Sequence, residues 1–169
     1  MSEMTHNLNW GAIELFAMDV DGVLTDGSLY VSSDGSETKR FSIIDGLGLV
    51  MLREAGVKIA WISGRGSEAT DRRAEELKVD FVIQGRKDKA IALSSLLEEL
   101  GLKPEQAAYM GDDTIDTEAI ELAAIGVAVP EAQPEPLASA NYTTRRVGGN
   151  GAVREVCNHI LAARSQLAK

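Results

Sequence analysis

The sequence predicts an α/β fold, a doubly wound parallel sheet with a projecting β-hairpin and no cap domain. Three observations support this prediction. Apolar runs of strand length alternate with longer amphipathic segments, polar loops containing glycine follow several of these runs, and no stretch of the 169 residues resembles a linker to a second domain. Alternating strands and helices are typical of parallel βαβ units with helices on both faces. We therefore expect residues 1–169 to form one domain.

Composition narrows the classes of partner. The formal net charge of −9 argues against a nucleic-acid partner, because binding a phosphate backbone needs a basic face. Cys157 is the only cysteine, which excludes an intramolecular disulfide. No apolar stretch approaches the roughly 20 residues that span a bilayer, and residues 1–11 look like a loose polar leader with no signal-peptide pattern. We expect a cytoplasmic protein with no membrane partner.

The first part of the chain predicts one strand and a hairpin. An apolar run makes Ile13–Asp19 the first strand. Two β-prone runs, residues 28–31 and 39–42, flank the turn signal Ser33-Asp34-Gly35 and predict a β-hairpin over residues 28–41. Because this hairpin interrupts the alternation of strands and helices, we expect it to project from the sheet, as a flap over a site or as an oligomer contact.

Periodicity and capping signals predict the remaining elements. Asp45 and Ser67 are expected to cap helices, whereas the prolines at 130, 134 and 136 predict a loop. The expected elements are a helix from Asp45 to about 55, a strand at 57–62, a helix from Ser67, a strand at 81–83, a helix at 88–100, a strand at 107–110, a helix at 114–124, strands at 126–129 and 141–143, and a helix at 152–163.

Two carboxylates follow the first strand. Asp19 and Asp21 are two residues apart in an extended segment, so their side chains point the same way. Like charges that close repel one another and need a cation or a proton. Gly22 and Gly27 allow the chain to leave the strand in a sharp turn. The pair therefore predicts a ligand site at the carboxyl end of a strand, where parallel α/β sheets bind their ligands.

Other predicted strand ends supply matching chemistry. Asp112 and Asp113 add carboxylates, which are the hard oxygen ligands that Mg²⁺ prefers. Ser63 with the backbone at Gly64, together with Lys89, could bind a phosphoryl group and neutralise its charge. The sequence thus predicts a Mg²⁺ and phosphate site at the carboxyl edge of the sheet.

Four segments resemble the motifs of the haloacid-dehalogenase-like phosphatases. They are Asp19-Val20-Asp21-Gly22-Val23-Leu24-Thr25-Asp26-Gly27, Ile62-Ser63-Gly64-Arg65, Asp88-Lys89, and Gly111-Asp112-Asp113-Thr114-Ile115-Asp116, and they occur in the family's order. Phe41-Ser42-Ile43-Ile44-Asp45-Gly46 and residues 148–155 resemble the small capless branch that contains phosphatases of 3-deoxy-D-manno-octulosonate 8-phosphate and of related nonulosonate 9-phosphates.

The resemblance implies a reaction. Asp19 would attack phosphorus to form an aspartyl-phosphate, and Asp21 would protonate the leaving oxygen and then activate water. Mg²⁺ would be held by Asp19, the backbone carbonyl of Asp21 and Asp112, with possible support from Asp113.

The resemblance also implies how substrate is held. Ser63, Gly64 and Lys89 would bind the phosphoryl oxygens, and Arg65 would meet a substrate carboxylate. The small sugar-acid phosphate would be enclosed by a homotetramer, in which the hairpin of one subunit covers the site of its neighbour.

Several alternatives stay open at this point. Lys87 lies close enough to Lys89 to be the phosphate ligand instead. Arg65 could form a structural ion pair, and Asp116 could support Asp112 or simply point to solvent. The chain could also act on a nonulosonate 9-phosphate, or serve as a non-catalytic tetramerisation module in sugar-nucleotide synthesis.

Overall fold

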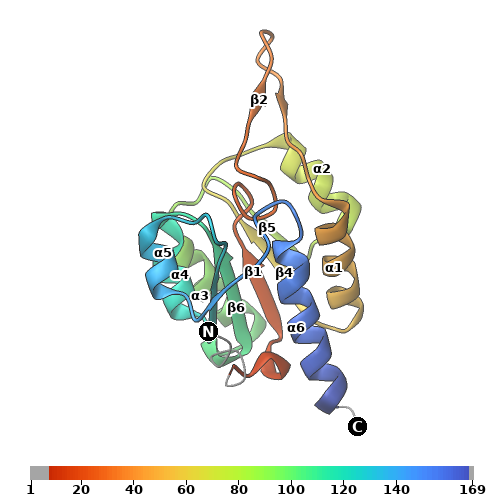
Figure 1. The fold of residues 1–169 in the computed structure, drawn as a ribbon, viewed down its shortest axis with the longest axis vertical. Helices are drawn as coiled ribbons and strands as arrows, with labels where there is room; N and C mark the ends of the chain where they lie inside the picture. Colours follow the sequence, from red (N-terminus) through yellow and green to blue (C-terminus); the bar gives the residue numbers. More distant parts are fainter. Residues whose placement is uncertain (1–7, 168–169) are drawn as a thin grey trace.

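A six-stranded sheet organises the protein (Figure 1), whose computed structural model describes residues 8–167. The strands lie in the order β5-β4-β1-β6-β7-β8, and every neighbouring pair is parallel. This confirms the predicted parallel α/β sheet. The strands are β1 (Leu15–Met18), β4 (Lys58–Ile62), β5 (Phe81–Ile83), β6 (Ala107–Gly111), β7 (Ile125–Ala128) and β8 (Tyr142–Thr143).

Helices cover both faces of the sheet, as the alternating pattern predicts. Side chains of β1 alternate between the faces, so Phe16 and Met18 pack in one core and Leu15 and Ala17 in the other. The first core includes residues of α1, α2 and α6, and the second includes residues of α3 and α4. The helices are α1 (Ile43–Glu54), α2 (Glu68–Leu77), α3 (Lys89–Leu100), α4 (Thr117–Leu122), α5 (Pro134–Ser139) and α6 (Ala152–Leu167).

The strand order has a switch point beside β1, where successive strands begin to be added on the other side of the sheet. From β1 the chain builds β4 and β5 on one side, and it then crosses to build β6, β7 and β8 on the other. Crevices that bind ligands in open α/β sheets lie at the carboxyl ends of strands next to such a switch. The loops that leave β1, β4 and β6 therefore meet at one edge of the sheet.

The hairpin extends well beyond the sheet in Figure 1, and its second strand lies earlier than expected. Its antiparallel strands are β2 (Tyr30–Val31) and β3 (Glu37–Thr38), whereas the sequence predicted residues 39–42 for the second. The prediction fails there because Lys39 turns inward: its side chain is fully buried against polar groups of the main body.

The start of α1 also differs from the prediction. Ser42 is the N-cap and accepts a hydrogen bond from the Asp45 backbone N–H, so Asp45 lies inside the first turn. The Asp45 carboxylate instead accepts hydrogen bonds from the backbone N–H groups of Gly151 and Arg154, at 3.0 and 2.8 Å. Asp45 therefore caps α6, a long-range role that local sequence does not encode.

Three further segments depart from expectation. The helix expected at 114–124 is a short 3₁₀ turn, η4 (Thr114–Asp116), followed by α4. The loop expected around the prolines contains α5, which Pro134 begins at a position where proline is favoured. The last helix runs on to Leu167 rather than ending near residue 163.

The expected leader is partly structured. Its residues 1–7 lie outside the described chain, but Trp10 lies in a 3₁₀ turn, η2 (Trp10–Ala12), and is buried. Its ring stacks on His159 with 5.1 Å between centroids. Of the helices within residues 8–167, none combines the length and the apolar character that crossing a bilayer would need.

Candidate active site

Asp19 lies at the centre of the site, directly after β1. Its backbone N–H donates to the carbonyl of Met110 on β6, so the sheet pairing continues to this residue. Its Oδ1 accepts a hydrogen bond from the Val20 N–H at 2.7 Å, and its Oδ2 lies 2.9 Å from Lys89 Nζ. The carboxylate is almost fully buried. Both of its oxygens are thus oriented by fixed donors.

Asp19 belongs to a cluster of three acids. Asp19, Asp112 and Asp116 each offer a carboxylate oxygen within 4.8 Å of the others. Burial, with the negative charge of Asp116, raises the pKa of Asp19 to about 6, although Lys89 opposes this. Burial and the charges of Asp19 and Asp116 raise the pKa of Asp112 to about 8. The cluster therefore favours a proton or a cation between its members.

Asp116 is the buried hub of this cluster. Its Oδ1 accepts hydrogen bonds from Lys89 Nζ and from the Tyr109 hydroxyl, both at 2.7 Å. Its Oδ2 accepts from the backbone N–H groups of Asp112 and Asp113, at 3.2 and 3.1 Å. Four donors therefore converge on one carboxylate, which fixes both the loop after β6 and the lysine. The sequence did not decide between this role and exposure to solvent.

The structure separates the roles of Asp112 and Asp113. Asp112 Oδ1 is buried and has no hydrogen-bond partner within the described chain. Asp113 is exposed, and its side chain accepts a hydrogen bond from the Thr114 N–H at the start of η4. Asp113 lines the cavity but is not part of the acidic cluster. Asp112 thus offers an unpartnered carboxylate oxygen and Asp113 caps η4, while metal binding by either residue stays a prediction.

Two of the expected phosphate-binding residues, Ser63 in the loop after β4 and Lys89 at the start of α3, are both buried. Ser63 is buried; its N–H donates to the Ile83 carbonyl, and its hydroxyl accepts from the Arg65 N–H at 3.2 Å. Lys89, the first residue of α3, is buried against Asp19, whereas Lys87 is exposed. The geometry places Lys89, and not Lys87, among the acids.

Arg65 forms an ion pair in this structure. Its Nη2 lies 2.8 Å from Glu37 Oε2 on the hairpin strand β3, and its side chain is about half exposed. The carboxylate of Glu37 therefore occupies one position at which a carboxylate could bind this guanidinium.

A cavity of about 160 Å³ opens over these groups. Its lining includes Asp21, whose carboxylate lies 2.6 Å from Lys39 Nζ. The remaining lining residues are Asp19, Ser63, Gly64, Arg65, Asp112, Asp113 and Ile115. The residues that the sequence singled out thus line one cavity, except Lys89, which is buried and is not among the lining residues.

A glycine permits the loop after β1 to approach β6. Gly22 has a φ of +93°, a conformation that favours glycine, and a Cβ at this position would overlap Asp112 Oδ2. The backbone of this loop is also tied by Thr25, whose hydroxyl accepts hydrogen bonds from the N–H groups of Gly22 and Gly27. The close contact between the first and last motifs therefore depends on the absence of a side chain at residue 22.

Comparison with known proteins agrees with this geometry. A family model described as haloacid dehalogenase-like hydrolase matches residues 79–156. The chain is 42% identical over 155 residues to the 3-deoxy-D-manno-octulosonate 8-phosphate phosphatase KdsC of Escherichia coli K12, covering 92% of this chain and 82% of the relative. The chain belongs to the 3-deoxy-D-manno-octulosonate 8-phosphate phosphatase family of haloacid dehalogenase-like hydrolases.

Solved structures of this family superpose closely. The phosphatase from Moraxella catarrhalis, crystallised with a magnesium ion, a phosphate ion and a KDO molecule, is 45% identical with a TM-score of 0.93 over 99% of this chain and 95% of that chain. The cobalt-bound phosphatase from Haemophilus influenzae is 35% identical with a TM-score of 0.89 over 93% of this chain and 92% of that chain.

The acidic cluster of this family member fits a divalent cation. Asp112 Oδ1 is a buried carboxylate oxygen without a partner, which is a costly arrangement unless a cation or proton satisfies it. Both oxygens of Asp116 already accept two hydrogen bonds each, so Asp116 orients the site rather than offering a free oxygen. Asp19 and Asp112 are therefore the carboxylates available to a metal. A carboxylate oxygen of each lies within 4.8 Å of the other, a limit that admits the ~4.2 Å span of opposite ligands on Mg²⁺.

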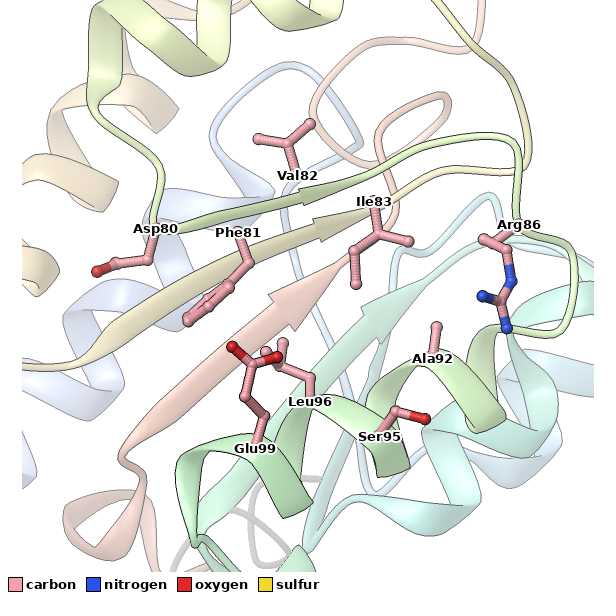
Figure 2. Close-up of a pocket in the computed structure, with 9 residues that line it drawn as sticks. All are labelled: Asp80, Phe81, Val82, Ile83, Arg86, Ala92, Ser95, Leu96 and Glu99. Atoms are coloured by element: carbon pink, nitrogen blue, oxygen red, sulfur yellow. The ribbon is translucent and has the colours of Figure 1, made fainter.

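A second pocket in this phosphatase fold includes none of the three residues of the acidic cluster in its lining. Figure 2 shows that Phe81 and Ile83 of the edge strand β5 point toward Ala92 and Leu96 of α3, while Val82 points away. Its volume, about 320 Å³, exceeds that of the cavity over Asp19. Its lining combines apolar side chains with the charged side chains of Asp80, Arg86 and Glu99, which do not point toward one common position. Size alone therefore does not identify the reactive site.

Proposed function

We propose that the protein is a Mg²⁺-dependent phosphatase that hydrolyses 3-deoxy-D-manno-octulosonate 8-phosphate through an aspartyl-phosphate. The observation that carries this proposal is Asp19, buried at the end of β1, with Lys89 at 2.9 Å and Asp112 in the same acidic cluster. The names of the relatives support the choice of sugar, and the Moraxella structure contains KDO together with phosphate and magnesium.

The proposed reaction has two steps. An oxygen of Asp19 attacks phosphorus, the bond between phosphorus and the sugar oxygen breaks, and Asp21 gives its proton to that leaving oxygen. Asp21 then takes a proton from water, whose oxygen attacks the phosphorus held on Asp19. This attack releases inorganic phosphate and restores the Asp19 carboxylate.

Charged and polar groups stabilise the transferred phosphoryl group. Lys89 faces Asp19, and Ser63 with the backbone at Gly64 forms the adjoining wall of the cavity. Mg²⁺ would be held by Asp19, Asp112 and the backbone carbonyl of Asp21. When bound, the cation neutralises the carboxylates and the phosphoryl oxygens, as metal ions do in phosphoryl transfer.

Arg65 is proposed to bind the carboxylate of the sugar acid. Its guanidinium is accessible beside the cavity, and Glu37 now pairs with it. A substrate carboxylate would replace Glu37 in this pair, or share the guanidinium with it.

The protein is further proposed to be a homotetramer in which hairpins cover neighbouring sites. The hairpin and the start of α1 expose several large apolar side chains, an arrangement typical of an interaction surface. They are Leu29, Tyr30, Val31, Ile43, Ile44 and Leu47. Light scattering should give four times the mass of the chain, and Val31→Asp should lower that mass. A monomeric wild type at micromolar concentration would contradict the assembly. A cytoplasmic location stays a prediction.

A panel of phosphate esters tests the activity. We expect hydrolysis of the octulosonate ester with Mg²⁺, loss of activity in EDTA, and no activity of Asp19→Asn. Asp80→Asn, at the opposite end of the sheet, is the matched control and should remain active. A higher kcat/KM for a nonulosonate 9-phosphate would change the substrate but keep the chemistry. A folded, metal-loaded protein inactive on every ester would favour the tetramerisation module.

A further inference from the structure

Lys39 is a buried lysine at the base of the hairpin. It directly follows β3, and its side chain is completely buried. Its Nζ lies 2.6 Å from Asp21 Oδ1 and donates a hydrogen bond to the Thr70 hydroxyl of α2 at 3.3 Å. Lysines are rarely buried in full, because an ammonium group loses its hydration unless it is paired. The ion pair with Asp21 is therefore what compensates Lys39 for its burial.

The surroundings of Lys39 hold its ammonium in place. Glu37 Oε1 lies 3.8 Å from Nζ and accepts a hydrogen bond from the Ser67 hydroxyl at 2.7 Å, while Glu37 Oε2 pairs with Arg65. Ser67 is in turn the N-cap of α2. The end of β3 is thus fastened to the first turn of α2 and to the loop after β4.

Asp21 has no comparable support of its own. Within residues 8–167, Lys39 is the only side chain that contacts the Asp21 carboxylate at ion-pair or hydrogen-bond distance. About a quarter of the Asp21 side chain is exposed, and it lines the cavity. Its carboxylate is therefore directed by one contact, and that contact comes from the hairpin.

We propose that Lys39 is a positioning residue that holds the Asp21 carboxylate at the edge of the cavity for proton transfer to the leaving oxygen. This inference rests on the proposed function, in which Asp21 is the acid and base. A general acid acts only within about 2.6–3.2 Å of its target, and a misplacement of about 1 Å can cost ~10²-fold in rate. The hairpin would therefore have two roles. It would position the acid of its own subunit for proton transfer, and it would cover the site of a neighbouring subunit.

The leaving group distinguishes positioning from a purely structural role. A sugar alkoxide needs a proton as it leaves, whereas p-nitrophenolate leaves readily without one. If Lys39 acts through Asp21, its loss should slow the release of the sugar far more than the release of p-nitrophenol. A general weakening of the site would slow both steps alike.

The experiment compares Lys39→Met with wild type in single-turnover release from octulosonate 8-phosphate and from p-nitrophenyl phosphate. We expect release of the sugar to fall by about 10²-fold and release of p-nitrophenol by less than about tenfold. Lys58→Met is the matched control, because Lys58 pairs with Asp80 at the other end of β4; both rates should stay at the wild-type value. In an Asp21→Asn background, Lys39→Met should cause no further loss.

Two results would overturn the inference. One is an equal loss on both substrates by a folded Lys39→Met protein, and the other is an additional loss in the Asp21→Asn background. If Lys39→Met does not fold, Lys39→Arg replaces it, because arginine keeps the positive charge but moves it. Release of the sugar should again fall more than release of p-nitrophenol, by a smaller factor. An equal fall in both rates would overturn the inference with this variant too. Failure of the proposed function is separate, since wild type would then release neither product.

Discussion

Asp116→Asn tests the hub that orders the acidic cluster. The amide is the same size as the carboxylate but has one acceptor oxygen in place of two. Asp116 now accepts from Lys89 and Tyr109 on one oxygen and from two backbone N–H groups on the other. Whichever way the amide turns, its NH₂ faces two of these donors. In one orientation they are the backbone N–H groups of Asp112 and Asp113, and in the other they are Tyr109 and Lys89, of which Lys89 keeps its contact with Asp19.

The expected loss of stability follows from the donors that lose this acceptor. A buried donor without a partner costs about 1–3 kcal/mol, so one or two such donors cost about 1–6 kcal/mol. One effect opposes this, because the neutral amide no longer repels Asp19 and Asp112. Near pH 7 without metal that relief comes from Asp19 alone, because Asp112, with a pKa of about 8, is then largely protonated. We therefore expect a net loss within a typical total of about 5–15 kcal/mol.

Urea unfolding at pH 7 in EDTA measures this loss without a contribution from bound metal. Asp113→Asn is the matched control, because it removes the same charge one turn away, where the side chain accepts only from backbone N–H groups of η4. The control should cost about 1 kcal/mol or less. If the two variants unfold with free energies within about 1 kcal/mol of each other, the reasoning about convergent buried donors is wrong.

Two further predictions concern the metal-free protein and the loop after β1. Stability in EDTA should fall as pH rises from about 4 to about 8, because the folded state keeps protons on Asp19 and Asp112 that the unfolded state has released. Thermal melts should show this slope, and Asp112→Asn should flatten it; a rising slope would contradict the raised pKa values. Gly22→Ala should lose Mg²⁺-dependent hydrolysis and about 1–2 kcal/mol of stability, because its φ is positive and its Cβ would overlap Asp112. Wild-type kinetics in that variant would show that the loop has room to move.

The sequence predicts the sheet and the strand-end residues because both depend on local pattern. Apolar runs of strand length end in polar residues at Asp19, Ser63 and Asp112, and parallel strands bring such ends together. The same logic places Lys89 at the start of a helix beside them. The positions of these residues follow from where each strand ends and from the parallel direction of the strands, and both can be predicted from the local sequence pattern.

The supporting residues depend on contacts between distant parts of the chain. Lys39 looks like an exposed strand residue because only the path of the hairpin turns it toward Asp21. Asp45 looks like a local helix cap, yet its partners lie over 100 residues further along, at the start of α6. Asp116 has a local signal, its position in the turn after Asp112, but the donors Lys89 and Tyr109 come from separate elements. Sequence pattern therefore finds the reacting groups more readily than the groups that hold them.

The balance of charge in the site leads to a last prediction. Asp19, Asp21, Asp112 and Asp116 are opposed by two buried lysines, Lys39 and Lys89, which leaves an excess of two negative charges when all the acids are ionised.

A divalent cation matches that excess. Because the pKa of Asp112 is about 8 without metal, its proton must leave for the cation to bind near pH 7. Calorimetric titration with Mg²⁺ in buffers of different ionisation enthalpy should therefore release close to one proton at pH 7 and fewer at pH 9. Asp112→Asn should abolish the release, whereas Asp113→Asn should preserve it. Equal proton release at both pH values would show that Asp112 is already ionised before the metal binds.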